Sequence, residues 1–109
     1  MTAITVYSDK TTKDIKGFEI KGHAGFAKSG EDIVCAAISI LAINTQNAIE
    51  QFCEDSFKQD GDEKSGLMKF WINGQPSHDT QVLLKAAKLG FVGIAKDYDK
   101  YVTLKFKEV

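Results

Sequence analysis

Residues 32–53, DIVCAAISILAINTQNAIEQFC, form the longest helical pattern in the chain, and the other elements are arranged around it. Asp32 is one of the residue types that cap helix N-termini, so the pattern predicts a helix over about 33–53. Its first half, 33–43, is apolar almost all round, which predicts a deeply buried end. The second half is polar on one side, through residues such as Asn44 and Gln46.

Upstream of this helix, alternating apolar and polar residues predict two strands. These cover 3–8 and 15–23, and the polar residues 9–14 between them predict the turn of a hairpin. In the second strand, Phe18 and Ile20 lie on one face, and alternation places His23 on the other.

Downstream, the pattern predicts at least two more strands and a second helix. Segment 55–73 holds one or two strands around the turn Asp60-Gly61-Asp62, and an amphipathic last strand begins at Val102. Between them, Ser77 caps a helix that runs to about Asp97. This helix contains Gly90 and Gly93, which weaken it and are best explained by close packing against a neighbour.

The order of these elements, β-β-α-β(-β)-α-β, predicts an α+β fold. We expect a two-layer sandwich, with a mixed or antiparallel sheet of about four to six strands and two helices on one face. The length of 109 residues, without repeats or linkers, predicts a single domain over 1–109.

Composition narrows the function classes. All 14 basic residues are lysines and the net charge is −1, so bidentate arginine contacts to phosphate or guanine are absent and we expect no direct nucleic-acid binding. No signal peptide pattern and no apolar run of about 18 residues is present, which predicts a cytoplasmic protein away from membranes. Two cysteines and two histidines without paired close spacing predict no metal site, and no cofactor motif is present.

Cys35 is the residue best placed for chemistry. Counted from Asp32 as N-cap, it occupies the third helical position, where unpaired N–H groups and the positive end of the helix dipole favour a thiolate. A thiolate is a nucleophile, and the same N–H groups can stabilise an oxyanion. His23 precedes Cys35 by twelve residues, and its imidazole is a candidate general base. The segment 24–31 between them is small and glycine-bearing, which predicts a mobile loop able to fold over a substrate.

Simpler interpretations stay open at this point. Free cysteine is among the most buried residue types, so packing alone explains Cys35, and a histidine on a polar strand face is commonly solvent-exposed. Strand alternation also places His23 opposite the face that the helix covers. The two side chains therefore meet only beyond the sheet edge, or if Gly22 kinks the strand.

The segments Gly22-His23-Ala24-Gly25 and Asp32-Ile33-Val34-Cys35-Ala36-Ala37-Ile38-Ser39 closely resemble the signature of the bacterial ribosomal-processing cysteine proteases, the Prp family. A looser resemblance extends over the whole chain. It implies a cytoplasmic homodimer that removes the short N-terminal extension of large-subunit ribosomal protein L twenty-seven, cutting after an aromatic residue and supporting ribosome maturation.

By the same resemblance, His23 and Cys35 form the catalytic dyad, as general base and nucleophile. Asp32 caps the helix and supports the site, while Gly25, Phe26 and Gly30 belong to a substrate loop. Phe26 is our candidate contributor to a pocket for the aromatic side chain. Two alternatives belong to other classes: a non-catalytic, ribosome-associated peptide-binding module, and a thiol-dependent hydrolase of another acyl substrate such as a thioester.

Overall fold

The structure, a computed structural model, describes residues 1–22, 31–62 and 64–109. Its elements follow the predicted order: β1 (Thr2–Ser8), β2 (Ile15–Lys21), α1 (Glu31–Phe52), β3 (Phe57–Asp62), β4 (Leu67–Ile72), α2 (His78–Asp97) and β5 (Val102–Glu108).

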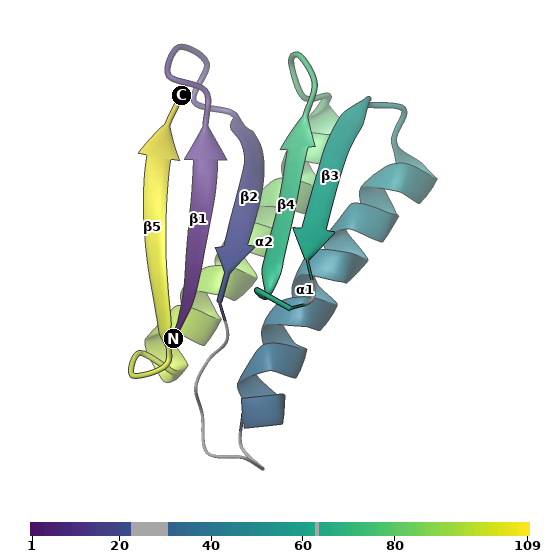
Figure 1. Cartoon of the computed structure of the whole chain (residues 1–109). Coiled ribbons are helices and arrows are strands. Elements are labelled where there is room, and N and C mark those ends of the chain that lie inside the picture. Colours follow the sequence, from purple (N-terminus) through teal and green to yellow (C-terminus); the bar gives the residue numbers. More distant parts are fainter. Residues whose placement is uncertain (23–30, 63) are drawn as a thin grey trace.

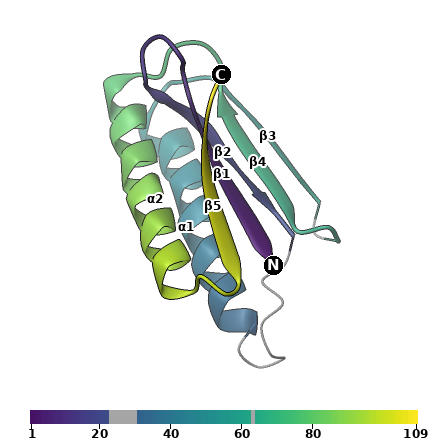
Figure 2. The same ribbon diagram turned by 90° about the vertical axis from the view of Figure 1, so that its left-hand side faces the viewer.

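The strands form one five-stranded sheet in the order β3-β4-β2-β1-β5. Strands β1 and β5 pair in parallel and the other neighbours pair antiparallel, so the sheet is mixed. Both helices cover the same face, α1 on the side of β3 and β4 (Figures 1 and 2). The prediction of a two-layer α+β sandwich with two helices on one face is confirmed.

The start of α1 differs from the prediction. The helix begins at Glu31, so Asp32 lies in the first turn and is not the N-cap, and Cys35 is the fifth helical residue. Asp and Glu are favourable both at the N-cap and within the first turn, because both places carry unpaired N–H groups and positive potential. Residue type alone therefore does not separate these positions.

The predicted extent of burial of α1 is also wrong. One stripe faces the sheet and is buried, but Ile33 and Ile40 are 59% and 67% exposed. A helix in a two-layer fold has only one covered side, so an all-round apolar segment leaves part of its surface in solvent. The buried stripe follows helical spacing through Val34, Ile38, Ala42 and Ile49.

Residues Ile33–Phe52 of α1 are long enough and apolar enough to cross a membrane. Length and composition do not distinguish a membrane span from the core helix of a soluble domain, which passes the same test. Here the buried stripe of α1 belongs to the same hydrophobic core as the sheet and α2. We therefore treat α1 as a core helix.

The turn between β3 and β4 lies further along the chain than predicted. Asp60, Gly61 and Asp62 continue β3 and pair with Lys69, Met68 and Leu67. The chain turns over 64–66, where Gly66 takes a positive φ of 69°. Glycine reaches that conformation without a steric penalty.

The start of α2 matches the prediction. Ser77 is the N-cap, and its hydroxyl accepts a hydrogen bond from the Thr80 backbone N–H at 3.3 Å. The Asp55 carboxylate accepts hydrogen bonds from the Ser77 backbone N–H (2.7 Å) and hydroxyl (2.6 Å). Partial burial raises the pKa of Asp55, but these hydrogen bonds outweigh it, and the net pKa lies below its usual value. Asp55 thus ties the segment after α1 to the start of α2.

The two glycines of α2 play different parts. A Cβ on Gly90 would lie 2.5 Å from Leu41 Cδ2 of α1, which confirms close packing at this position. Gly93 has no neighbour within 4 Å of such a Cβ, so close packing does not explain it.

An aromatic pair lies on the face of the sheet opposite the helices. Tyr7 of β1 and Trp71 of β4 have ring centroids 5.3 Å apart although β2 runs between their strands. The residue of β2 between them is Gly17, which pairs with both and has no side chain to separate the rings. Burial and the Glu19 carboxylate raise the pKa of Tyr7.

Candidate active site

Cys35 is half-buried and borders a cavity of about 720 Å³ between α1 and the sheet. Cys35 both packs against the edge of the core and lines this space. The cavity is walled by the first three turns or so of α1 beyond Cys35, by the ends of β1 and β2, and by the β3–β4 hairpin. Its lining residues are Thr2, Ile20, Gly22, Cys35, Ile38, Ser39, Ile43, Gln46, Gln59, Asp60, Gly61, Asp62, Gly66, Leu67 and Met68.

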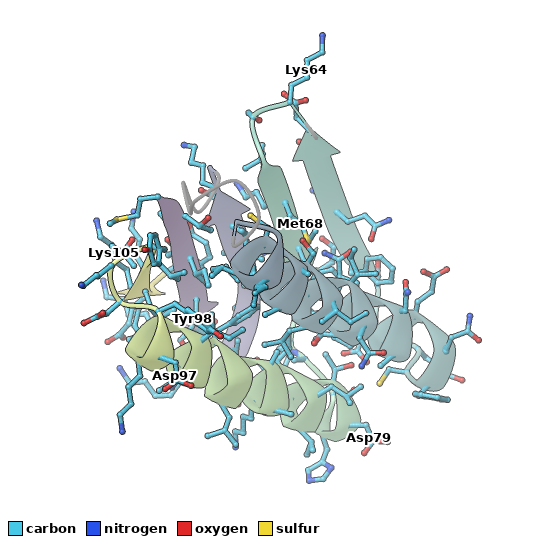
Figure 3. All side chains as sticks on the ribbon, turned by 90° about the horizontal axis from the view of Figure 1, so that it is seen from below. Lys64, Met68, Asp79, Asp97, Tyr98 and Lys105 are labelled. Carbon is cyan, nitrogen blue, oxygen red and sulfur yellow. The ribbon has the colours of Figure 1, made fainter. Side chains whose placement is uncertain are left out.

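The β3–β4 hairpin provides the wall opposite α1. Viewed from below, its tip, near Lys64, projects away from the helix layer, while Met68 lies on the side that faces α1 (Figure 3). Met68 also packs against the core and lines the cavity. The site is therefore an open cleft, and a segment of chain can enter it without unfolding either layer.

Gly22 changes the direction of the chain at the end of β2. The strand ends at Lys21, and Gly22 has a φ of +85°, in the left-handed region. Its backbone also passes so close to Met1 that a Cβ would lie 2.8 Å from the Met1 carbonyl oxygen. Strand alternation therefore ends at Gly22, the residue at which the sequence required a kink if His23 and Cys35 are to meet. His23 itself, with Gly25, Phe26 and Gly30, lies outside the described residues.

Cys53 is separated from this site by the length of α1. Its backbone N–H donates to the Ile49 carbonyl just beyond the end of the helix, and its thiol is free. Cys53 follows Cys35 by eighteen positions, which corresponds to about 27 Å along a helix and excludes a disulfide between them. Within the described parts of the chain, no group of three or more His, Cys, Asp or Glu side chains is placed to hold a metal ion.

Several cavity residues were not singled out from the sequence. Ser39 and Gln46 follow Cys35 by four and eleven residues, which places all three on one face of α1. Helical spacing alone could have identified these two. The hairpin residues, by contrast, reach the site only through the pairing of β4 with β2, which no local pattern specifies.

Known proteins resemble this chain in sequence and in fold. The *Bacillus subtilis* ribosomal processing cysteine protease Prp is 28% identical over 90 residues, covering 79% of this chain and 80% of that protein. A crystal structure of an essential ribosomal processing protease Prp from *S. aureus*, with a covalently linked product peptide, has a TM-score of 0.89 at 20% identity, covering 98% of this chain and all (100%) of that one. A crystal structure of a Streptococcus mutans protein has a TM-score of 0.82 at 32% identity, covering 100% of this chain and 96% of that one.

A free thiol on an open cleft, together with these matches, defines the class as cysteine protease. The family model described as cysteine protease Prp matches residues 1–103, and the chain belongs to that family.

Proposed function

We propose that this protein is a cytoplasmic endopeptidase that removes the short N-terminal extension of large-subunit ribosomal protein L twenty-seven. The observation that carries the proposal is the position of Cys35, half-buried on an open cleft large enough for a peptide. The *S. aureus* relative has been solved both with a substrate peptide and with a covalently linked product peptide, which supports a peptide substrate and a covalent step.

In the proposed mechanism, Cys35 is the nucleophile and His23 the general base. His23 takes the proton of the Cys35 thiol, and the thiolate attacks the scissile carbonyl carbon, so that a C–S bond forms and the carbonyl π electrons move to the oxygen. His23 then gives that proton to the leaving amine as the C–N bond breaks, which leaves a thioester. Water, deprotonated by His23, attacks this thioester; the C–S bond breaks, the proton returns from His23 to the sulfur, and the new carboxyl terminus is released.

Helix α1 supplies the electrostatic part of the proposed mechanism. Its first turn holds backbone N–H groups without partners inside the helix, and the positive end of its dipole lies there. These groups stabilise the oxyanion formed after attack. Because Cys35 is the fifth helical residue, its own N–H lies within the helical hydrogen-bond pattern. We therefore assign the oxyanion donors to the turn before Cys35. Asp32 adds negative charge to that turn and supports the helix start, while Gly25, Phe26 and Gly30 close over the peptide.

We further propose that the protein works as a homodimer. Apolar side chains remain exposed on the outer surface of both helices, among them Ile40 of α1 (67%) and Leu89 of α2 (75%). Large exposed apolar side chains are the kind of surface that a second copy covers. Light scattering during gel filtration gives the mass in solution. A monomer at micromolar concentration would contradict this part of the proposal.

The decisive experiment incubates the purified protein with the host's own ribosomal protein precursor and measures product masses. We expect one cut that removes the N-terminal extension. The Cys35→Ala variant should abolish the cut without unfolding the protein, while the matched Cys53→Ala variant should keep it, because Cys53 lies at the far end of α1. Full activity in Cys35→Ala would refute the nucleophile. Peptide binding without cleavage by the wild-type protein would instead favour a non-catalytic peptide-binding module.

His23→Ala tests the base in the same assay. Turnover should fall by at least about 100-fold, the usual scale for loss of general acid–base catalysis, while peptide binding persists. A turnover near that of the wild type would remove His23 from the mechanism.

A further inference from the structure

The cavity extends well beyond the reach of the Cys35 thiol. Gln46 lines its far part and follows Cys35 by three turns of α1, about 16 Å along the helix axis. An extended peptide covers that distance with about five residues. Gln59 of the edge strand β3 also lines the cavity.

The amide of Gln46 is buried without a partner. Its Nε2 atom is buried and has no hydrogen-bond partner among the described residues. The same holds for the hydroxyl of Thr2, which lines the cavity at the ends of β1 and β2. Buried polar side-chain atoms are nearly always paired, because an unpaired one costs about 1–3 kcal/mol.

Gln81 is a buried glutamine whose side-chain amide is fully hydrogen-bonded within the protein, and it serves as a comparison for Gln46. It is buried in α2, its Oε1 accepts from the Ile15 N–H at 2.7 Å, and its Nε2 donates to the Ile15 carbonyl at 3.0 Å. Both ends of its amide are therefore used. Gln46 lacks such a partner at Nε2, although it lies on a similarly well-packed helix, and the cavity is the space that it borders.

We propose that the far end of the cavity is a substrate subsite in which Gln46 Nε2 donates a hydrogen bond to a carbonyl oxygen of the bound peptide, about five residues from the scissile bond. This inference rests on the proposed peptidase function and adds to it a residue that sets how much of the substrate is recognised. Gln46 is then a binding residue, remote from the bond that breaks.

Two substitutions separate this role from a structural one. Gln46→Met keeps the size of the side chain and removes the donor, so long peptides should bind about two- to tenfold more weakly, as expected for one neutral hydrogen bond. The free variant should be at least as stable as the wild type, because an unpaired buried donor is gone. Gln46→Glu keeps the shape but places an acceptor where the peptide carbonyl lies, so it should weaken binding further. Gln51→Met, at an exposed glutamine on the same helix, is the matched control and should change neither property.

Binding is measured by calorimetry in a Cys35→Ala background, so that the readout does not depend on catalysis. The probes are a synthetic peptide with about six residues on either side of the precursor's processing site, and two versions each shortened on one side to about two residues. We expect Gln46→Met to weaken binding of the long peptide and of one shortened version, and to leave the other unchanged.

An equal effect on all three peptides, or no effect on any, would overturn the subsite. So would a Gln46→Met variant that is clearly less stable than the wild type and binds normally. Cleavage of the precursor by the wild-type protein is scored separately, so a failed subsite and a failed peptidase give different results. A long peptide that does not bind at all would overturn both.

Discussion

Replacing Gly22 with alanine tests whether the backbone at the end of β2 positions His23, the general base that we propose. An L-residue in the left-handed region costs about 1–2 kcal/mol. The stiffer unfolded chain of an alanine variant returns about 0.4–1 kcal/mol. The new Cβ would also lie 2.8 Å from the Met1 carbonyl oxygen, a backbone atom that cannot rotate away. Overpacking of this kind costs a further ~1–3 kcal/mol. We expect a total loss of about 1–5 kcal/mol, and a domain with a stability of about 5–15 kcal/mol stays folded over most of that range.

Gly74→Ala is the matched control for this substitution. Gly74 has a φ of +75°, so it carries the same backbone cost, but no atom lies within 4 Å of its Cβ and it is absent from the cavity lining. It should lose about 1 kcal/mol and keep full activity.

Urea unfolding gives the stability of both variants, and cleavage of a precursor peptide gives their turnover. Gly22→Ala relieves its clash by moving the chain that leads into His23, so its turnover should fall about 10- to 100-fold in the folded protein. If Gly22→Ala folds and turns over substrate as fast as Gly74→Ala, the bend at Gly22 does not set the position of His23.

Three further predictions concern the helices and their ends. Gly93→Ala should stabilise the protein by about 1 kcal/mol and raise the melting temperature by about 4–8 °C, because α2 gains helix propensity at an open position; an unchanged or lower melting temperature would contradict this. Iodoacetamide should label Cys35 faster than Cys53 at neutral pH, because the dipole of α1 favours negative charge near its start and disfavours it near its end. Peptide mapping after a timed pulse measures both rates, and equal rates would count against the dipole. Asp55→Asn should cost about 1 kcal/mol at pH 7. The folded-state pKa of Asp55 is lowered, so its contribution is present above the unfolded pKa of about 4 and is lost as the pH falls through the folded value. Unfolding at pH 7 and pH 3 should therefore show the difference from wild type shrinking, and a constant difference would refute the assignment.

Most of the fold follows from local patterns in the sequence. Helical periodicity predicts both helices. Ser77 also predicts the start of α2, because a serine directly before a helical pattern is typical of an N-cap. The predicted start of α1 differs from the observed one because acidic residues such as Glu31 and Asp32 are favourable at several positions of a first turn. The predicted position of the β3–β4 turn differs from the observed one because a glycine fits both a turn and a strand. The pairing of Gly61 with Met68 places it in the strand, and no local pattern predicts that pairing.

The site was predictable only in part. Cys35 and its place near a helix start follow from the sequence, and the cavity agrees with that prediction. The opposite wall does not follow, because the hairpin meets α1 only after β4 has paired with β2. Gln46 was noted only as a polar helix residue, since a missing hydrogen bond is visible only when the surroundings of the amide are known. The catalytic roles of Cys35 and His23 and the supporting role of Asp32 stay predictions.

The bare backbone of Gly17 also has a consequence for how the sheet assembles. Tyr7 and Trp71 touch only when the glycine lies between them. A slip of β2 by one residue would place Lys16 or Phe18 there, separate the rings, and turn the apolar side chains of β2 toward water. The aromatic contact therefore stabilises only the native register of β1, β2 and β4, and sheets that form in another register during folding lack it.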